Sequence, residues 1–418
     1  MLVGAPRKRS LDRHHTHDHL EELGRLTDTA GAIVVGSLVQ NVDRPDSATY
    51  IGSGKLEELK ELIAERDATV VIFDDELSPA QGKNLEEALA KRVIDRAELI
   101  LDIFAVRART AEAKMQVELA QLEYSLPRLT RMWTHLEKFR GGIGVRGPGE
   151  TQLETDRRLV NHRIKLLKER LADVVRSRAV QRKNRKGEFR VALVGYTNAG
   201  KSSLLRALSE TRDIFVEDRL FATLDPLTRQ AALGEKQVAL VTDTVGFIRK
   251  LPHDLVASFR ATLEEVAEAE LLLHVIDASH PAWEEHRLVV DQVLADLGAG
   301  ETPMWYVFNK MDRLSPEHAE ALRERILNLY PTAVFTSATQ AEGHRTLIAR
   351  LAETARARRA AVALRVPVGA GKLLAELHRV GEVLTTTADE ETGDLIVEAR
   401  LDAASLARAQ SQGAVLAG

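Results

Sequence analysis

Residues 189–209, FRVALVGYTNAGKSSLLRALS, decide the fold of this chain. The stretch opens with a short apolar run that is typical of a buried β-strand, and it closes with a run that favours a helix. Between them stands a complete G-x-x-x-x-G-K-[ST] motif, the pattern of a phosphate-binding P-loop. The motif consists of Gly195, Tyr196, Thr197, Asn198, Ala199, Gly200, Lys201 and Ser202.

Each part of this motif has a physical role in phosphate binding. The glycines let backbone N–H groups turn toward phosphate oxygens, and the positive end of the following helix adds to the attraction. We expect Lys201 to reach the β- and γ-phosphates and the Ser202 hydroxyl to ligate Mg²⁺. The segment from Gly195 to Ser203 is therefore the predicted cradle for the phosphates.

A second motif, Asp243-Thr244-Val245-Gly246, follows the predicted strand Gln237–Val241. A carboxylate at the end of such a strand holds Mg²⁺ through water, and the glycine N–H meets the γ-phosphate. Between the two motifs we expect a mobile segment with a second Mg²⁺-binding hydroxyl. Thr223, in Phe221-Ala222-Thr223, is the predicted ligand, with Thr228 as the alternative. Such a segment orders around the γ-phosphate and relaxes after hydrolysis.

The third motif, Asn309-Lys310-Met311-Asp312, closes the predicted strand Met304–Phe308. The Asp312 carboxylate can accept from both N1–H and the exocyclic amine of guanine, whereas adenine offers neither donor at that edge. A site built for such donors rejects the wrong base by ~10⁴-fold. Ser337-Ala338 follows as a fourth element, with a backbone N–H for guanine O6. The bound nucleotides are therefore predicted to be GTP and GDP.

One position departs from many GTPases. A glutamine often follows the glycine of the Asp-x-x-Gly element and orients the attacking water, but this chain has Phe247 there. A phenyl ring cannot orient water. We therefore expect slow intrinsic hydrolysis at the predicted catalytic residues Lys201, Thr223 and Gly246, accelerated when a partner supplies or orders the missing group.

The pattern around the P-loop predicts a doubly wound α/β domain. Further strands are expected at Leu271–Ile276 and Ala333–Phe335, with helices after Gly200, Asp254, Pro281, Pro316 and Gly343. Four domains are predicted: an N-terminal α/β domain (1–105), a basic helical hairpin (106–186), a P-loop G domain (187–360) and a small α+β C-terminal domain (361–418). In the C-terminal domain we expect a strand, a helix near Leu373–Leu377, a hairpin around Gly393 and a last helix.

The first hundred residues favour a parallel sheet covered by helices. Strands are predicted at Ala32–Val35, Val70–Phe73 and Leu99–Phe104, and helices at Leu56–Ala64 and Pro79–Leu89. After them, apolar residues recur at steps of four and three, which indicates two helices that fold back on each other. Pro127 is expected to interrupt the first helix. The loop Gly141–Glu150, rich in glycine, forms the predicted tip.

Charge is segregated along the chain. Residues 107–190 hold 21 Lys and Arg against 10 Asp and Glu, whereas the whole chain has a net charge of -4. This favours a polyanionic partner at the basic segment, although solvated helix faces are also rich in Lys and Arg.

The absence of cysteine excludes thiol chemistry. No apolar run reaches the roughly 18 residues of a membrane span, so we expect a cytoplasmic protein without membrane insertion.

These motifs together resemble the HflX family of translational GTPases. The most specific part of the resemblance is GGIGVRGPGETQLETDRR, residues 141–158, and YIGSGK at 50–55, FDDELSPAQ at 73–81 and QVELAQL at 116–122 add to it. The resemblance implies a GTPase that binds the large ribosomal subunit and dissociates stalled or idle ribosomes. It also implies that the hairpin and its glycine-rich loop contact rRNA. We expect the protein to be monomeric.

Two other functions stay open at this point. The first is a ribosome-assembly or RNA-remodelling GTPase, which would carry the same nucleotide motifs. The second is a regulatory switch that binds a membrane or a protein instead of the ribosome. Ribosome splitting with GTP separates the first from the main prediction. Sedimentation with ribosomes across a salt series separates the second, because binding to RNA weakens steeply as salt rises.

Overall fold

The structure is a computed structural model that describes residues 1–7, 15–129, 148–182, 188–209, 220–234, 237–251, 265–340, 342–389, 392–401 and 403–417. The chain divides into two compact units. Residues 1–176, 217–225 and 245–264 form the first unit, and residues 177–216, 226–244 and 265–418 form the second. Two short segments that contain predicted site residues therefore belong with the N-terminal part of the chain.

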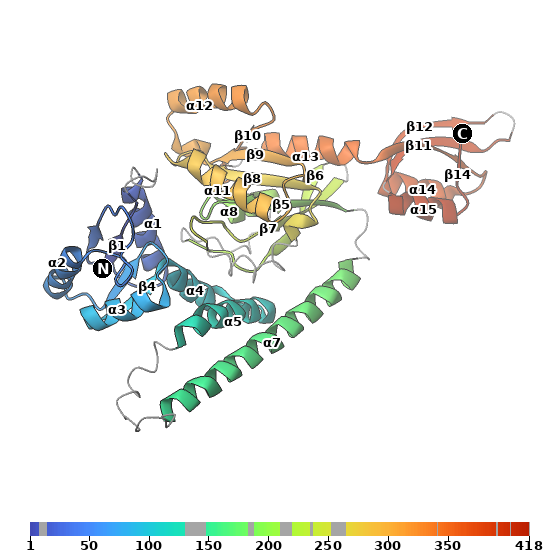
Figure 1. Ribbon diagram of the computed structural model, residues 1–418. Helices are drawn as coiled ribbons and strands as arrows, with labels where there is room; N and C mark the ends of the chain where they lie inside the picture. Colours follow the sequence, from blue (N-terminus) through green and yellow to red (C-terminus); the bar gives the residue numbers. More distant parts are fainter. Residues whose placement is uncertain are drawn as a thin grey trace. The chain divides into compact units, whose positions relative to one another are not determined.

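The first unit contains a parallel sheet with the strand order β2-β1-β3-β4 (Figure 1). Its largest buried side chains include Phe73, Leu59 and Leu85, which pack in one core. The predicted parallel sheet is thus confirmed. The elements are β1 (Leu2–Gly4), α1 (Thr16–Thr29), β2 (Ser37–Val39), α2 (Ser53–Glu65), β3 (Val70–Phe73), α3 (Pro79–Leu89), β4 (Arg92–Asp95) and α4 (Arg96–Arg107).

Helix α3 begins where its sequence predicts. The Ser78 hydroxyl accepts from the Gln81 N–H, and the Gln81 side chain accepts from the Ser78 N–H, which is a capping box.

Two predicted strands are wrong. Residues 99–104 lie within α4, where nearly every side chain is buried, so the apolar run marks a buried helix. Residues 32–35 are irregular, and the strand forms only at Ser37–Val39.

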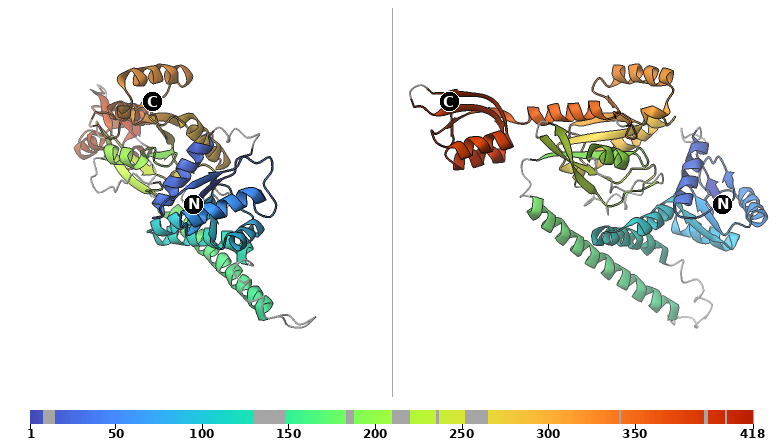
Figure 2. Two further views of the ribbon diagram at one scale, coloured as in Figure 1. Left: turned by 90° about the vertical axis from the view of Figure 1, so that its left-hand side faces the viewer. Right: turned by 180° about the vertical axis from the view of Figure 1, so that it is seen from behind.

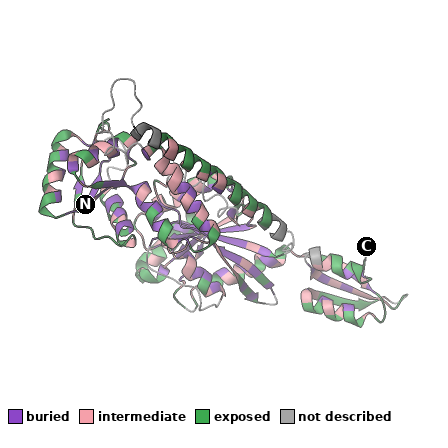
Figure 3. Ribbon diagram, turned by 90° about the horizontal axis from the view of Figure 1, so that it is seen from below, coloured by how far each residue is buried: buried purple, intermediate pink, exposed green. Residues whose placement is uncertain are grey.

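Helices α5 (Ala111–Ser125) and α7 (Pro148–Arg182) form the predicted helical pair. Their contact is an apolar seam around Leu119, Ile164 and Leu167, flanked by the ion pair between Arg163 and Glu118. The short 3₁₀ turn η2 (Leu126–Arg128) ends α5, which confirms the predicted interruption at its proline. Half-buried and exposed residues follow one another around α7 (Figure 3). The predicted tip, residues 141–150, lies largely outside the described residues.

The second unit contains a six-stranded sheet with the order β10-β9-β8-β5-β7-β6, in which only β6 is antiparallel to its neighbour. Helices α8 and α13 pack on one face, and α11 and α12 pack on the other (Figure 2). The strands are β5 (Phe189–Gly195), β6 (Leu227–Gly234), β7 (Gln237–Asp243), β8 (Leu271–Asp277), β9 (Met304–Asn309) and β10 (Val334–Phe335), and the helices are α8 (Lys201–Ser209), α11 (Trp283–Asp296), α12 (Pro316–Leu329) and α13 (Arg345–Ala357).

This arrangement confirms the predicted doubly wound domain. The sequence prediction did not include β6. In this edge strand only Ala231 and Leu233 are buried, so the strand has no clear apolar run. The helix predicted after Asp254 lies outside the described residues. Among the residues that the structure describes, no helix has the length and apolar character to cross a membrane.

The C-terminal part of the second unit is a separate four-stranded antiparallel sheet with the order β12-β13-β11-β14. Leu364, Val397 and Leu377 are among the residues of its own core. The β-α-β-β-α-β order is that of a ferredoxin-like fold, which agrees with the predicted small α+β domain. Its elements are β11 (Ala360–Val366), α14 (Gly371–Val380), β12 (Glu382–Ala388), β13 (Leu395–Leu401), α15 (Ala403–Ser411) and β14 (Val415–Leu416).

The seam between α5 and α7 gives a test of the helical pair. Leu167 is fully buried, whereas Leu159 on the same helix is 60% exposed. Leu167→Ala should lower the free energy of unfolding by about 2–5 kcal/mol, because it leaves a cavity in the seam. Leu159→Ala is the matched control and should change it by less than about 0.5 kcal/mol. Equal effects in denaturant unfolding would show that the seam is not packed as described.

Candidate nucleotide-binding site

The turn after β5 can be built only with glycine at two positions. Gly195 has φ +152°, and a Cβ on it would lie 2.3 Å from the Val275 carbonyl oxygen. Gly200 has φ +94°, and a Cβ there would lie 2.3 Å from Nδ2 of Asn309. These close approaches bring the turn against β8 and against the last residue of β9. The glycines of the P-loop motif are therefore fixed by packing as well as by backbone conformation.

Lys201 begins α8, and its side chain is buried. Its Nζ donates to the carbonyl oxygens of Gly195 and Tyr196, each at 3.1 Å. Burial lowers the pKa of Lys201 to about 8; the charge of Asp243 opposes this shift and that of Lys310 adds to it. The ammonium is thus a cation whose charge is poorly compensated, at the place where the motif predicts phosphates.

The side chains of Ser202 and Asp243 meet between α8 and the end of β7. The Ser202 hydroxyl donates to Oδ2 of Asp243 at 2.6 Å, and Asp243 is fully buried. The next residue, Thr244, donates its hydroxyl to the Leu193 carbonyl at 2.7 Å, which ties the end of β7 to β5. A hydroxyl and a carboxylate side by side are oxygen ligands of the kind that Mg²⁺ prefers. The residues present therefore fit the predicted ion.

The Asn-Lys-x-Asp segment is bound to the P-loop by its first two side chains. Asn309 donates from Nδ2 to the Ala199 carbonyl at 3.0 Å. Lys310 donates to the Asn198 carbonyl at 2.8 Å and to Oδ2 of Asp277 at 2.7 Å. These bonds fix the spacing between the phosphate turn and the end of β9. Asp277, at the end of β8, was missed at the sequence level because no motif contains it.

Asp312 lies in the short turn η4 (Met311–Arg313), and its carboxylate faces the loop after β10. Oδ1 of Asp312 accepts from the Ser337 hydroxyl at 2.5 Å, and Oδ2 accepts from the Thr339 hydroxyl at 3.1 Å. The backbone N–H of Ala338 donates to Oδ1 of Asn309 at 3.2 Å. The second unit thus brings together the predicted P-loop, Asp243-Thr244, Asn309-Lys310, Asp312 and Ser337-Ala338.

The predicted residues 221–223 and 245–246 belong to the first unit. Phe221 is buried with φ +54°, and its ring packs edge-on against Phe104, with ring centroids 4.7 Å apart. Asp225 accepts from the backbone N–H of Arg109 at 3.0 Å and from the Thr110 hydroxyl. The segment that contains Ala222 and Thr223 is therefore held at both ends by N-terminal residues. Thr228, the alternative ligand, lies on β6 and shares a hydrogen bond with the Thr242 hydroxyl at 2.8 Å.

The segment after Val245 and Gly246 is also held within the first unit. Phe247 is 2% exposed, so the ring at the usual glutamine position is part of a core. Lys250 has φ +51° and donates to Asp74 at 2.6 Å and to Asp75 at 2.7 Å.

Asp74 is itself buried and bound to the buried Arg96, at 2.8 Å. Arg96 also binds Glu22, which pairs with Arg249 at 3.5 Å. Two consecutive residues, Arg249 and Lys250, thus enter a network of buried charges made by the N-terminal region.

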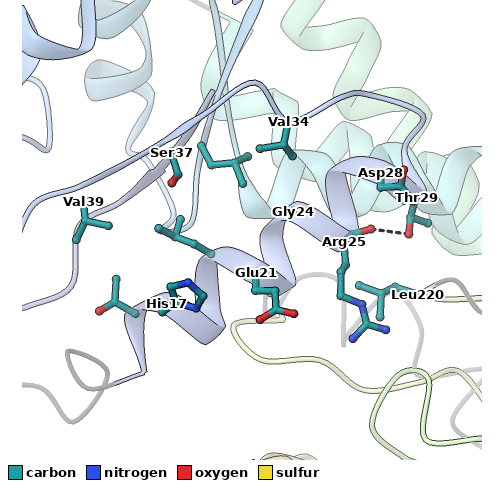
Figure 4. Close-up of a pocket in the computed structure, with 13 residues that line it drawn as sticks. His17, Glu21, Gly24, Arg25, Asp28, Thr29, Val34, Ser37, Val39 and Leu220 are labelled. Atoms are coloured by element: carbon teal, nitrogen blue, oxygen red, sulfur yellow. Dashed lines mark hydrogen bonds between the residues drawn. The ribbon is translucent and has the colours of Figure 1, made fainter. Parts of the chain in front are cut away.

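A cavity of about 750 Å³ lies beside α1 in the same unit (Figure 4). Its walls are largely apolar, with Glu21, Arg25 and Asp28 on the helix side. Leu220, which directly precedes the segment with Phe221 and Thr223, is one of its lining residues. The cavity therefore borders a segment that we expect to respond to nucleotide.

A phosphate-binding turn with a buried lysine, joined through Asn309 and Lys310 to an aspartate suited to a purine edge, is the arrangement of the P-loop GTPases. The chain is of this class. Family models described as GTP-binding GTPase N-terminal, GTP-binding GTPase Middle Region and 50S ribosome-binding GTPase match residues 17–105, 107–185 and 190–310. The chain belongs to the HflX family of GTPases, as its relatives show.

The relatives named GTPase HflX are similar over most of their length. The protein of Magnetococcus marinus is 45% identical over 396 residues, which cover 94% of this chain and 90% of the relative. The protein of Escherichia coli is 44% identical over 386 residues, with 92% and 90% covered. The protein of Flavobacterium psychrophilum is 46% identical over 357 residues, with 81% and 86% covered. The family resemblance of the sequence is confirmed, and the chain is a GTP-binding enzyme that hydrolyses GTP.

Nucleotide binding should be linked to proton uptake through Lys201. Because the pKa of Lys201 is lowered to about 8 and neighbouring phosphates would raise it, the free protein loses this proton above about pH 8 and must regain it on binding. The affinity for GDP should therefore fall as pH rises above about 8, by up to tenfold per pH unit. Calorimetry in buffers of different ionisation enthalpy measures the uptake. An affinity and a proton count that stay constant would contradict this assignment.

Proposed function

We propose that the site described above binds GTP with Mg²⁺ through the residues that its motifs predict. Lys201 and the N–H groups of the turn Gly195–Ser203 would hold the β- and γ-phosphates, and Ser202 and Asp243 would hold the ion. Bound Mg²⁺ supplies positive charge that stabilises the transferring phosphoryl group. The observation that carries the proposal is the joining of the Lys201 turn and Asp312 at one sheet edge through Asn309 and Lys310.

Base recognition is assigned to Asp312, and the Ala338 N–H, which the structure pairs with Oδ1 of Asn309, would turn to guanine O6 when the base binds. A carboxylate accepts the two adjacent N–H groups of guanine, and adenine lacks both. The two hydroxyls that bind Asp312 keep its oxygens in place. The preference for guanine then follows from hydrogen bonds that adenine would leave unmade, each with a cost.

We assign Thr223 as the second Mg²⁺ ligand and the Gly246 N–H as a donor to the γ-phosphate. Both residues lie in segments that are fixed to the N-terminal region, through Phe221, Asp225 and Lys250. Loss of the γ-phosphate would release one end of each segment and change the forces on this region. The N-terminal unit is thus the part of the chain that receives the nucleotide signal.

Hydrolysis requires a group that positions water, and Phe247 is buried in the first unit. We infer that a binding partner supplies or orders this group, so that GTP turnover depends on the partner. One matching family model is described as a 50S ribosome-binding GTPase, and residues 107–190 carry the excess of positive charge. The large ribosomal subunit and its rRNA are therefore the proposed partner of the helical pair and its glycine-rich loop.

The function that follows is dissociation or rescue of stalled or idle ribosomes, driven by the GTP state. A ribosome-assembly or RNA-remodelling GTPase is the second candidate, because it would use the same site and the same charge. We further propose a monomeric, cytoplasmic protein with the four domains 1–105, 106–186, 187–360 and 361–418. Limited proteolysis tests these boundaries.

Base recognition is tested by Asp312→Asn. The amide would donate to the carbonyl of xanthine and no longer accept from the exocyclic amine of guanine, so XDP should bind better than GDP. We expect a loss of GDP affinity of at least ~100-fold, as for a charged acceptor removed from a paired site. Competition with a fluorescent nucleotide measures both affinities. Retained preference for GDP would place base recognition elsewhere.

Partner dependence is tested by GTP hydrolysis with and without large ribosomal subunits. Hydrolysis should be slow alone and rise by at least ~100-fold with the subunit, and Lys201→Ala should abolish both rates. The association constant for the large subunit should fall linearly with salt concentration on logarithmic axes, because counterions leave the rRNA when the protein binds.

Splitting of assembled ribosomes with GTP distinguishes the main proposal from the assembly candidate. An unchanged hydrolysis rate would refute the ribosomal proposal.

A further inference from the structure

Both oxygens of the Asp312 carboxylate are held by hydroxyl groups from one loop. The Ser337 hydroxyl binds Oδ1 at 2.5 Å, and the Thr339 hydroxyl binds Oδ2 at 3.1 Å. The two hydroxyl oxygens lie 3.2 Å apart. Ser337 belongs to the recognised Ser-Ala motif, but Thr339 is in no motif that the sequence analysis found. Because of Thr339, each oxygen of the carboxylate accepts a hydrogen bond from a hydroxyl group; we call this a bracketed carboxylate.

A bracketed carboxylate suits a ligand edge with two adjacent N–H groups. Each ionised oxygen accepts about two hydrogen bonds, so one hydroxyl leaves room for one further donor on each oxygen. The two hydroxyls also prevent the carboxylate from rotating about its terminal bond. Although burial opposes the shift, the bonds from Ser337 and Thr339 help to lower the pKa of Asp312, so the group stays ionised.

The loop that carries Thr339 is held in place by a close contact. A Cβ on Gly343 would lie 2.4 Å from the Ser337 carbonyl oxygen, and the Ser337 N–H donates to the Gly343 carbonyl at 3.0 Å. Gly343 therefore fixes the turn from which both hydroxyls reach Asp312. Thr339 itself is exposed, so its methyl and hydroxyl groups contribute little to the core. Its hydroxyl contacts only Asp312 and Ser337 among the hydrogen bonds described, and both contacts belong to the base-binding loop.

We propose that Thr339 is a specificity-determining residue for the guanine base, because its hydroxyl positions Oδ2 of Asp312 toward the N–H donors of the purine. The proposal rests on the role of Asp312 in base recognition given above. Thr339 is a positioning residue, since it acts on the base through the carboxylate. Its chemistry predicts that serine can replace it and that valine, of the same shape without the hydroxyl, cannot.

The experiment compares Thr339→Val and Thr339→Ser with the wild type, using GDP and ADP as probes in competition with a fluorescent nucleotide. Thr339→Val should weaken GDP binding by about twofold to tenfold, the effect of one hydrogen bond. It should leave ADP unchanged, because adenine does not use the carboxylate. Thr339→Ser should restore GDP binding to within about twofold. Thr332→Val, at another exposed threonine of the same unit, is the matched control and should bind both nucleotides like the wild type.

A pH series adds a measurement that mere damage to the loop would not reproduce. Without the Thr339 hydroxyl, Asp312 takes up a proton at higher pH, so the loss of GDP affinity in acid should begin at higher pH in Thr339→Val than in the wild type. An equal loss for GDP and ADP would overturn the proposal, as would unchanged GDP binding.

The behaviour of Asp312→Asn separates the two levels of the argument. If Asp312→Asn prefers XDP and Thr339→Val binds GDP normally, only the role of Thr339 is wrong. If Asp312→Asn keeps its preference for GDP, the assigned base site is wrong and the role of Thr339 is overturned with it.

Discussion

The Lys201 ammonium is buried in the phosphate-binding turn, where it donates to the carbonyl oxygens of Gly195 and Tyr196, and the other groups of the site are arranged around it. A cation held by two backbone carbonyls in a buried position has lost hydration that those carbonyls only partly replace. Its environment therefore favours an anion beside it. The lowered pKa of Lys201 has the same cause, which is the loss of hydration of the buried ammonium. The close approach of Gly195 to Val275 places this lysine at the carboxyl edge of the sheet. At that edge, ligands of open α/β sheets bind.

Two chain segments, residues 217–225 and 245–264, belong to the first unit although they follow stretches of the second unit in sequence. Their anchor points are unusual for non-glycine residues, since Phe221 and Lys250 both have positive φ. Such conformations cost of order 1–3 kcal/mol each. The ring contact of Phe221 with Phe104 and the ion pairs of Lys250 offset this cost. The two anchored segments contain Thr223 and Gly246, the residues that are proposed to respond to the γ-phosphate.

Much of the fold and of the site could be predicted from the sequence because the motifs are local. The P-loop, the Asp-x-x-Gly segment and the Asn-Lys-x-Asp segment each follow a strand whose apolar run is short and clear. Parallel strands bring such segments to one edge, so their meeting follows from topology. Prediction was wrong for residues 99–104, because all of them except Asp102 are buried, and such an apolar run shows no helical period.

Interactions between distant residues could not be predicted in this way. The pairing of Lys310 with Asp277 and of Thr339 with Asp312 depends on how loops from different strands meet. The burial of Phe247 in the first unit depends on long-range packing, which no spacing in the sequence records.

A crystal structure with GDP and Mg²⁺ would show where the nucleotide binds. In it, the β-phosphate should lie within hydrogen-bond distance of the Lys201 Nζ, the ion should contact the Ser202 hydroxyl, and N1 and N2 of guanine should face the Asp312 carboxylate. Nucleotide density elsewhere, or a base turned away from Asp312, would contradict the assigned site.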